Sequence, residues 1–529
     1  MAAVEVAFDA KRDRLVIFAS TLGTVFEWYD FFVYGTLASI VAGHFFPTDN
    51  PAVSFLIFLA SFGVGFGMRP LGAIMFGIAG DRLGRKYTFL VTIAVMGVAT
   101  AAVGLLPTYE TIGVAAPILL VLCRVLQGLA LGGEYGGAAI YVAEHAPRNR
   151  RGFYTSFIQA GVGAGFMLSV SVVLAANLMM DKADFVAWGW RIPFLFSLIL
   201  LAISLWVRLK LNESPVFQAM KDAGATARNP LRESFDSWPK VKLILVAMVG
   251  GAAGMTVIWY TAQFQSLYFL QNSLRIDDNP ARLIAGASAL CSVFFFVLFG
   301  WVSDKIGRKK PILIGYALAV FLLFPLFHTL AQAGNPGLAA AMARAPVVVT
   351  GSDCSFDPFA TKGQATPCGD VLEALSKKGV AYDKIDGAPG AAPIVTIGGG
   401  TVDSSDPAAL DAGLAAAGYN LEKITPPLPN AMIMVLCILG VGMLSGMTYG
   451  PMAAMFVELF PARVRYTSMS VPYHIGAGYF GGFLPFISQF IVAKTGDPFA
   501  GLWYTIGVCV VAFIVTLIWI PETSGKELD

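Results

Sequence analysis

A charged loop, Gly77-Ile-Ala-Gly-Asp81-Arg82-Leu-Gly84-Arg85-Lys86, follows a long apolar segment and returns 223 positions later as Gly300-Trp-Val-Ser-Asp304-Lys305-Ile-Gly307-Arg308-Lys309. The first and last glycines, the acidic residue and the basic residues keep their spacing in both copies. Self-similarity at so long a period indicates that one half of the chain was duplicated from the other. The sequence therefore predicts two parallel halves with the same order of segments.

A second repeat locates an insertion. Tyr135 precedes Glu144 by the same spacing by which Tyr449 precedes Glu458, but this pair has an offset of 314 positions. The second half has therefore gained 91 residues, the difference between the two offsets, before Tyr449. They fall in the polar, Ala- and Gly-rich stretch 331–429, which holds no apolar run long enough to cross a bilayer.

The composition indicates a membrane protein. Hydrophobic residues make up 56% of the 529 residues and charged residues only 13%, whereas soluble domains carry about 25% charged residues. Apolar runs of roughly 20 residues recur, as transmembrane helices require, and the alternating strands of a β-barrel are absent. The 36 basic and 34 acidic residues give a net charge of +2, which carries no nucleic-acid signature.

We therefore predict an all-α polytopic membrane protein of twelve transmembrane helices in two six-helix halves, with a small extracytoplasmic α/β insertion. The expected domains are an N-terminal bundle at 1–211, a cytoplasmic linker at 212–240, and a C-terminal bundle at 241–529 interrupted by 331–429. The expected spans are 15–45, 54–76, 88–107, 115–144, 152–178, 191–211, 241–271, 282–303, 311–332, 430–459, 467–493 and 500–520.

Charge asymmetry predicts the orientation. With the N-terminus inside, the inner segments hold 23 Lys and Arg residues and the short outer loops hold four, namely Lys182, Arg275, Arg282 and Lys494. By the positive-inside rule both termini are cytoplasmic and the insertion is outside. Glu27 interrupts the first apolar run and no small-residue cleavage site follows it, so no cleavable signal peptide is expected.

The insertion is expected to be a small α/β cap. Segments 370–382 and 406–419 have helical patterns, and Ile394–Ile397 and Leu421–Ile424 have strand-like composition. It contains no histidine, no nucleophile motif and no metal-ligand spacing, so neither an enzyme nor a metal site is expected. Its two cysteines, Cys354 and Cys368, are predicted to form a disulfide, because they lie outside the cytoplasm in a unit too small for a large core.

Several motifs resemble those of a known transporter family. The repeated loop resembles that of the major facilitator superfamily, and Arg124-Val-Leu-Gln127-Gly128 resembles its usual companion. Glu27-Trp28-Tyr29-Asp30 with Gly132-Gly133-Glu134-Tyr135 resembles the metabolite:proton symporter branch more narrowly. Further matching stretches are Met68-Arg69-Pro70, Trp188-Gly-Trp-Arg191, Glu213-Ser214-Pro215 and Arg463-Val-Arg465.

The resemblance implies a proton-coupled importer in a bacterial inner membrane. Members of the branch take up organic acids or zwitterionic osmolytes with a proton, so the expected partners are a small organic anion or zwitterion and the lipid bilayer. No nucleic acid, and no cofactor other than the proton as coupling ion, is expected. A monomer is expected to suffice for function.

A set of charged residues at the inner ends of the helices is expected to form the gate. Asp81 is placed to cap a neighbouring helix N-terminus and Arg85 to pair with Glu144. A simple anchoring role at the cytoplasmic surface is the alternative. The repeat and the segments beyond spans 6 and 12 supply the remaining gating candidates Asp304, Arg308, Glu458, Glu213 and Glu522.

Proton coupling is assigned to carboxylates in the apolar spans. Glu27 and Asp30 are three residues apart on one helix face. A carboxylate at that depth takes up a proton more readily than one in water. Asp30 is the preferred carrier with Glu27 as its modulator, and Glu134 is the rival; a structural hydrogen bond, or a Glu134 pair with Arg69, is the alternative.

Substrate binding is assigned to Arg124, which falls near the midplane of its span. A buried guanidinium requires an anion, and its planar fork suits a carboxylate. A permanent pair with Asp30 or Glu27 is the competing interpretation. Arg69 carries the same inference at a depth nearer the inner surface. The other expected lining residues are Tyr34, Gln127, Gln159, Tyr260, Gln263 and His474.

The leading hypothesis is proton-coupled uptake of a mono-, di- or tricarboxylate by alternating access. Uptake of betaine or proline is the nearest alternative. Proton-driven efflux and a receptor that senses through 331–429 are the alternatives of other kinds. The several arginines near the expected cavity favour an anion.

Overall fold

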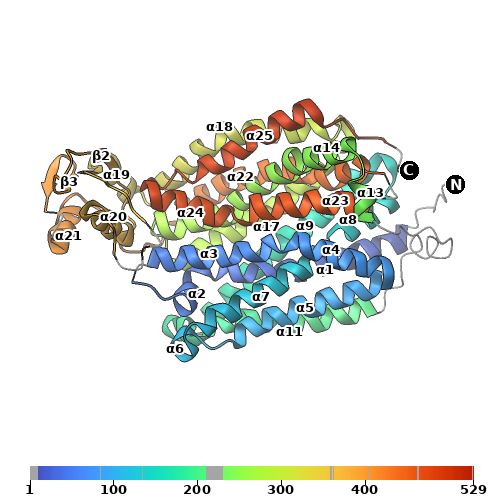
Figure 1. Cartoon of the computed structure of the whole chain (residues 1–529), viewed down its shortest axis with the longest axis horizontal. Helices are drawn as coiled ribbons and strands as arrows, with labels where there is room; N and C mark the ends of the chain where they lie inside the picture. Colours follow the sequence, from blue (N-terminus) through green and yellow to red (C-terminus); the bar gives the residue numbers. More distant parts are fainter. Residues whose placement is uncertain are drawn as a thin grey trace.

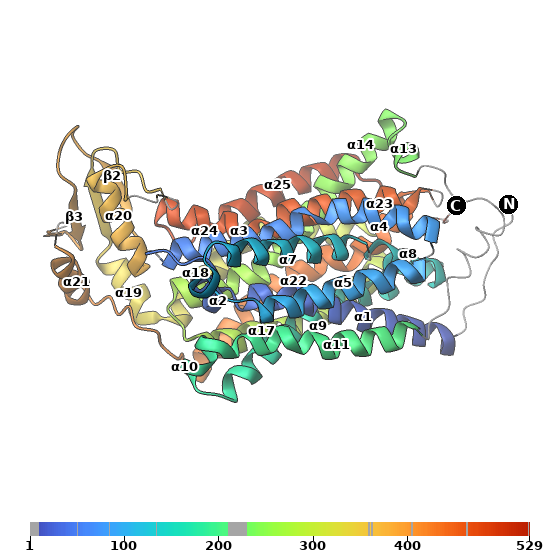
Figure 2. The same cartoon turned by 60° about the horizontal axis from the view of Figure 1, so that its bottom comes forward.

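Long helices that run side by side form the body of the protein, and a small α/β unit covers one end of it (Figure 1). The computed structural model describes residues 10–49, 51–83, 85–133, 135–209, 230–357, 360, 363–403, 406–461, 464–526 and 528. Helix α1 begins at the end of the bundle where the C-terminus lies, and the α/β unit occupies the opposite end (Figures 1 and 2). We call these the terminal end and the insertion end.

The N-terminal half contains six spans, of which the second and the fourth each comprise two helices. The short helices α2 (Ala38–Phe45), α6 (Tyr109–Ile112) and α10 (Lys182–Asp184) lie at its insertion end (Figure 2). The spans are α1 (Ala10–Thr36), α3 (Pro51–Gly67) with α4 (Arg69–Leu83), α5 (Arg85–Leu105), α7 (Ala115–Gly132) with α8 (Tyr135–His145), α9 (Arg151–Leu178) and α11 (Arg191–Leu209).

The C-terminal half repeats this order. Its first and fifth spans contain π-helical turns, which are rare and concentrate at functional sites. The spans are α14 (Trp238–Val246) continuing through α15 (Gly254–Tyr260) to η5 (Phe269–Ser273), α17 (Asp278–Ile306), α18 (Lys309–Gly334), α22 (Leu428–Leu459), α23 (Arg465–Ile475) continuing through η6 (Gly476–Gly482) to α24 (Leu484–Thr495), and α25 (Leu502–Trp519). The short α13 (Pro230–Ser234) precedes them.

The predicted fold class of twelve spans in two halves with a small insertion is confirmed. Among the described residues nine helices are long and apolar enough to cross a bilayer, and a tenth span is bent by 59° near Gly189. Large apolar side chains such as Leu122, Phe294 and Phe321 are exposed on the sides of the bundle. Lipid solvates such side chains, so their exposure carries no hydrophobic penalty in a membrane.

Small residues bring the helices of the N-terminal half close together. A Cβ atom on Gly128 of α7 would lie 1.9 Å from the Gly65 carbonyl oxygen of α3, and one on Gly132 would lie 2.1 Å from the Arg69 carbonyl oxygen. A larger side chain at either position would force the backbones apart. This contact fixes α7 against α3 and α4, and it sets the positions of Arg124 and Arg69.

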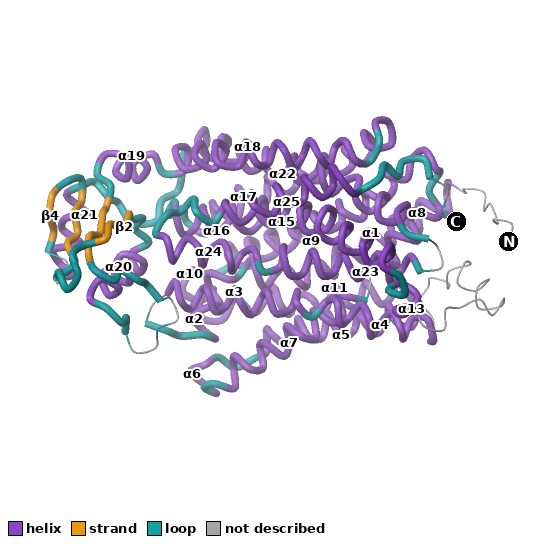
Figure 3. Tube along the Cα trace, turned by 45° about the horizontal axis from the view of Figure 1, so that its top comes forward, coloured by secondary structure: helices purple, strands orange, loops and turns teal. Residues whose placement is uncertain are grey.

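The insertion contains a four-stranded sheet in the order β2-β1-β3-β4, and all the strands of the described chain lie at this end (Figure 3). Val348 of β1 pairs with Asp383 in parallel and with Thr396 in antiparallel register. Its elements are α19 (Pro336–Arg344), β1 (Val347–Gly351), α20 (Pro367–Lys378), β2 (Asp383–Asp386), β3 (Ile394–Ile397), β4 (Gly400–Val402) and α21 (Pro407–Ala416).

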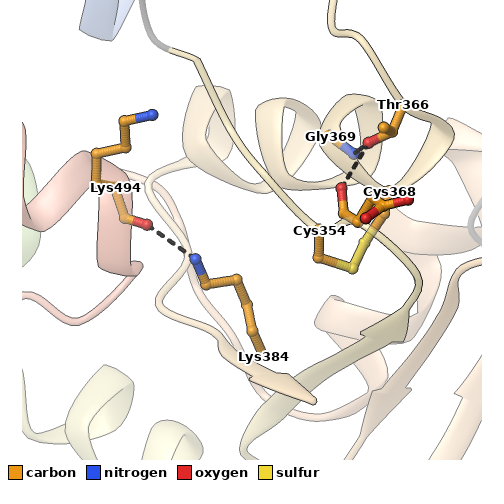
Figure 4. The surroundings of a disulfide bond; sticks show 7 residues. Cys354, Thr366, Cys368, Gly369, Lys384 and Lys494 are labelled. Carbon is orange, nitrogen blue, oxygen red and sulfur yellow. Dashed lines mark hydrogen bonds between the residues drawn. A yellow bond between two sulfur atoms is a disulfide. The ribbon is translucent and has the colours of Figure 1, made fainter. Parts of the chain in front are cut away.

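The α/β character of the insertion is confirmed, but one of its predicted strands is wrong. Leu421–Ile424 forms no strand: only Ile424 makes a single bridge, to Ile276 at the head of α17. Cys354 and Cys368 form a disulfide with Cα atoms 4.9 Å apart (Figure 4). It ties the segment after β1 to the first turn of α20.

The insertion is attached to the C-terminal half. Lys384 of β2 donates from Nζ to the Lys494 carbonyl oxygen at 3.1 Å (Figure 4), and the Tyr382 N–H donates to the Gly496 carbonyl at 3.3 Å. Where the insertion leaves and rejoins the bundle, Asn430 Nδ2 of α22 donates to the Ala333 carbonyl of α18 at 2.8 Å. The insertion therefore begins and ends at one narrow neck.

Candidate functional site

Arg124 of α7 is fully buried and lies among aromatic rings. Its guanidinium carbon is 4.2 Å from the centre of the Phe31 ring and 4.4 Å from that of Tyr34. Its Nη1 donates to Gln127 Oε1 at 2.6 Å, while its Nε and Nη2 are buried without a hydrogen-bond partner. The ring faces stabilise the positive charge, but two donor nitrogens still lack an acceptor. An anion that reaches this point meets a prepared donor pair.

Arg69 is the second fully buried guanidinium. It begins α4 directly after the break at Met68, and its carbon lies 5.1 Å from the Trp28 ring centre and 5.6 Å from that of Tyr473. Its Nε and Nη2 also have no hydrogen-bond partner. Because Tyr473 belongs to the other half, Arg69 lies where the two halves meet.

Asp30 and Glu27 are both buried on α1, each about 5% exposed. The Oδ1 atom of Asp30 has no hydrogen-bond partner. The competing interpretation of a permanent Arg124 pair with Asp30 is not seen, because Arg124 bonds through Nη1 to Gln127 and its two other nitrogens are free of partners. The third carboxylate candidate, Glu134, lies outside the described residues.

A polar chain connects Arg124 to the backbone beside Asp30. Gln127 Nε2 donates to Thr100 Oγ1 at 2.6 Å. The Thr100 hydroxyl lies 2.9 Å from the Met96 carbonyl and 3.4 Å from the Asp30 carbonyl. Sequence reasoning missed Thr100, since a threonine in an apolar run carries no signal of its own. The helix α5 thereby places a hydroxyl between Gln127 and the backbone of α1 at Asp30.

The other expected lining residues are all buried. The Tyr34 hydroxyl is hydrogen-bonded to Ser61 Oγ, and Gln159 of α9 is 1% exposed. In the C-terminal half the Tyr260 hydroxyl and both ring nitrogens of His474 have no hydrogen-bond partner. Gln263 lies in the π-helical segment Thr261–Gln265. Polar groups from both halves are thus buried in an otherwise apolar interior.

At the terminal end, the second copy of the charged loop joins the two halves. Asp304 of α17 accepts from the backbone N–H groups of Gly152 and Phe153, both at 2.8 Å. These N–H groups belong to the first turn of α9, where the helix dipole favours a negative charge. Arg308 bonds to Asp304 at 2.6 Å, and its Nη2 and Nε bond to the Glu458 oxygens at 3.1 and 3.2 Å.

The C-terminal segment closes over this cluster. Glu522 accepts from the backbone N–H groups of Arg308 and Lys309 at 2.8 and 3.1 Å. Burial raises the pKa of Glu522, but hydrogen bonds from Ser524, Arg308, Lys309 and Thr523 lower it more, so the pKa lies below its usual value. Arg151 donates to the Lys526 carbonyl at 2.7 Å. One hydrogen-bonded network therefore spans both halves and the tail.

Four of the gating candidates cannot be placed in this network. Glu213 lies outside the described residues. The side chains of Asp81, Arg85 and Glu144 also lie outside them, although all three positions are helical.

The two halves are also in contact at the insertion end. The Tyr268 hydroxyl donates to the Gly35 carbonyl at 2.9 Å, and Asn279 Nδ2 donates to Asn177 Oδ1 at 2.7 Å. Gly35 accommodates the Phe264 ring, which a Cβ atom would approach to 2.6 Å. Since contacts close both ends, the central side chains are enclosed.

The position of Arg282 differs from the expected one. This residue was counted with the outer loops at the first residue of the expected span 282–303, but α17 begins at Asp278 and Arg282 is fully buried within it. Its Nη1 is 3.3 Å from Asn279 Oδ1, and its Nε and Nη2 have no partner. Asn279 three residues earlier was the available signal, because polar residues at that spacing share a helix face.

In chemical terms the arrangement can bind an anion and exclude water from it. Arg124 and Arg69 supply unpaired N–H donors, the aromatic rings supply an apolar surround, and Asp30 supplies a buried acid. No group of His, Cys, Asp and Glu suited to a metal ion occurs among the described residues. The site therefore combines unpaired donors with an apolar surround, as a buried anion-binding site requires.

Comparisons with known proteins find similar transporters. The family model described as "Sugar (and other) transporter" matches residues 15–255 and 414–529. The Escherichia coli shikimate transporter is 39% identical over 332 residues, which are 62% of this chain and 74% of the relative. The E. coli proline/betaine transporter is 37% identical over 60% of this chain and 65% of its own length. The E. coli inner membrane metabolite transport protein YhjE is 28% identical over 97% and 95%.

Solved structures share the fold. The proton:xylose symporter XylE bound to 6-bromo-6-deoxy-D-glucose superposes with a TM-score of 0.63 at 15% identity, covering 98% of both chains. The partially occluded inward-open conformation of the E. coli xylose transporter XylE gives 0.60 at 17% identity, covering 98% of this chain and all of the other. At these identities the likeness concerns the fold alone.

Proposed function

The chain belongs to the sugar (and other) transporter family of the major facilitator superfamily, and on that premise we propose that it imports a small organic acid together with a proton. It is a transporter of small metabolites and not an enzyme. The substrate class, the direction and the roles of the residues are the content of the proposal.

One observation supports the proposal above the others: Arg124 is fully buried, yet its Nε and Nη2 have no acceptor. Leaving such donors unpaired is costly, and a carboxylate accepts from both through a planar fork. Arg69, equally buried with two unpaired donor nitrogens, offers a second contact for a dicarboxylate or for a ring hydroxyl. A substrate anion thus completes a site that the protein leaves incomplete.

Asp30 is the proposed proton carrier. A substrate anion that enters beside a buried carboxylate adds a second negative charge to a low-dielectric interior, and a proton on Asp30 removes one of them. The Gln127 and Thr100 side chains connect Arg124 to the backbone carbonyl of Asp30 through hydrogen bonds. Substrate and proton therefore favour each other's binding, which is the condition for symport.

The charged network at the terminal end is the proposed inner gate. Asp304, Arg308 and Glu458 are buried together and can remain so only while α17 stays against α9. The Tyr268–Gly35 contact is the proposed outer gate. Alternating access then consists of breaking one set of contacts while the other holds. The terminal end is taken as cytoplasmic because Lys and Arg concentrate there in the sequence.

A zwitterionic osmolyte is the second candidate, because relatives that carry proline and betaine are 37% identical. Its carboxylate would suit Arg124, and aromatic rings bind quaternary ammonium groups. The rings of Phe31 and Tyr34, however, already face the Arg124 guanidinium. They are thus engaged by a cation of the protein, which favours a ligand with net negative charge.

Transport into proteoliposomes tests the proposal. With an inward proton gradient, we expect labelled shikimate to accumulate above its equilibrium level and a protonophore to abolish the accumulation. Glycine betaine, tested in parallel, should not accumulate. Accumulation of betaine in place of shikimate would favour the zwitterion candidate, and gradient-driven loss of preloaded shikimate would contradict import.

A further inference from the structure

A cavity of about 290 Å³ lies between the insertion and the insertion end of the bundle. Its walls come from three parts of the protein. Phe55 of α3 belongs to the N-terminal half, Gln489 of α24 to the C-terminal half, and Met342 and Tyr382 to the insertion. The volume lies near the lower end of the range for small-molecule sites, about 300–1,000 Å³. It is separate from the enclosed centre around Arg124, none of whose residues lines it.

The charged residues that line the cavity are all basic. They are Arg275, Lys377 and Lys423, and no lining residue is acidic. Lys377 is paired with Glu373 at 3.2 Å, and Lys423 with Asp278 at 2.7 Å. Arg275, in contrast, has no carboxylate partner among the described residues. The cavity therefore contains one uncompensated positive charge flanked by two lysines.

Arg275 is held in position by the backbone around it. It has a left-handed conformation, with φ 56°, which residues other than glycine rarely adopt and which tends to occur at functional positions. Its Nη2 atom donates to the Lys378 carbonyl at the end of α20. Gly379 permits this approach, since a Cβ atom there would lie 2.6 Å from Arg275 Nη2. The strained turn and the bond fix the guanidinium at the cavity wall.

The Nε atom of Arg275 is buried and has no hydrogen-bond partner. Burial also lowers the pKa of Arg275, as expected for a cation that lacks a compensating charge. The remaining wall is mostly apolar and aromatic, with Leu338, Val380, Tyr419 and Val492 among its residues. A ligand that satisfies both features has a negative group for Arg275 and a compact apolar body.

We propose that this cavity is a second binding site, which takes a small carboxylate anion at the outer mouth of the transporter with Arg275 as its anchor. Phe55 moves with the N-terminal half and the insertion with the C-terminal half, so the walls separate when the outer gate opens. An anion in the cavity bridges the halves and stabilises the outward-closed arrangement. The proposal requires neither import nor a role for Arg124.

Equilibrium binding of labelled benzoate, succinate and shikimate to the purified full chain tests the site. The background variant is Arg124→Ala, which removes the central anion site of the proposed function. In that background we expect saturable binding of at least one probe, and Arg275→Gln should weaken it at least tenfold. The matched control is Lys378→Gln, because Lys378 pairs with Asp411 at 2.5 Å and does not line the cavity. It should bind like its background.

Met342→Trp serves as a second variant, since it fills the cavity without changing any charge. It should also abolish the residual binding, and an unchanged thermal unfolding midpoint would show that the variant is folded. The site is disproved if no probe binds saturably to the Arg124→Ala protein, or if binding survives both Arg275→Gln and Met342→Trp. Loss of binding in Arg124→Ala with intact transport by the wild type would contradict this site alone, and not the proposed function.

Discussion

Asp304 and Gly152 join the two halves of the transporter at its terminal end: a carboxylate oxygen of Asp304 accepts the Gly152 backbone N–H at 2.8 Å. The acceptor comes from α17 in the C-terminal half and the donor from α9 in the N-terminal half. The same carboxylate bonds to Arg308. A single acidic group therefore connects the first turn of α9 in the N-terminal half to the ion-pair cluster of the C-terminal half.

We expect Asp304→Asn to slow transport without weakening substrate binding. The change removes a negative charge from a helix N-terminus, which costs up to about 2 kcal/mol at a partly buried site. It should shift the equilibrium between the closed and open states by roughly 5- to 30-fold toward the state that is open at the terminal end. Substrate exchange in proteoliposomes and equilibrium binding in detergent measure the two quantities. Asp236→Asn is the control, since Asp236 pairs with the exposed Lys240; strongly weakened binding with unchanged exchange would refute the gating role.

Arg124→Ala should strongly weaken binding of the transported acid at the central site. Hydrogen bonds to charged groups contribute about 1.5–3 kcal/mol, which corresponds to a loss of roughly 10- to 150-fold in affinity. Arg124→Lys should recover only part of the affinity, because an ammonium group cannot reproduce the planar fork. Isothermal titration with the identified substrate measures both. Equal binding by the Lys and Ala variants would show that the fork is not the recognition element.

Asp30→Asn should separate exchange from accumulation. The amide resembles the protonated acid in shape and charge, so the loaded carrier still crosses and counterflow exchange persists. Uphill uptake on a pH gradient should be lost, because the side chain no longer releases a proton. Both are measured in the same proteoliposomes. If Asp30→Asn still accumulates substrate, the proton carrier lies elsewhere, and Glu27, Glu134 and His474 are the next positions to replace.

The disulfide predicts how many cysteines react with a thiol reagent. Of the six cysteines, four are free and Cys354 and Cys368 are joined. The unfolded protein should bind four equivalents of a thiol reagent before reduction and six after it; six before reduction would exclude the bond. The bond closes a loop of 14 residues, and cross-links of this size stabilise by about 3 kcal/mol. Cys354→Ser with Cys368→Ser should therefore speed proteolysis of the insertion.

The lowered pKa of Glu522 predicts that the attachment of the C-terminal segment is sensitive to acid. Because the pKa of Glu522 is lowered in the folded state, its stabilisation is present above the unfolded pKa of about 4.3 and is lost as the pH falls through the lower folded value. A spin label on Lys526→Cys should therefore become mobile only at strongly acidic pH. Adding Glu522→Gln should make it mobile at neutral pH, and an immobile label in that variant would contradict the assignment.

The sequence predicted the spans to within a few residues because charges and prolines bound each apolar run. Helices nevertheless extend past those runs, which is why Arg282 was assigned to a loop although it is buried in α17. Strand β2 escaped prediction because all four of its residues are exposed, so it lacks the alternation of a half-buried strand.

The charged residues of the site could be predicted from the sequence, whereas two of its neutral residues could not. Arg124, Arg69 and Asp30 are conspicuous because ionisable groups are rare in apolar spans. Thr100 and Tyr268 are ordinary residues for such a span, and their roles depend on which helix packs beside them. That information lies in the tertiary structure, where Gln127 reaches Thr100 and Tyr268 reaches Gly35.

The hydrogen bond between Asn430 and Ala333 has a consequence for protein engineering. Since the two chain ends of the insertion meet there, a linker of a few residues can replace everything between α18 and α22 without stretching either helix. The same neck can carry a foreign domain of similar size. The bundle thus offers a modular graft point, at which an affinity handle or a fluorescent reporter can be placed on the face opposite the termini.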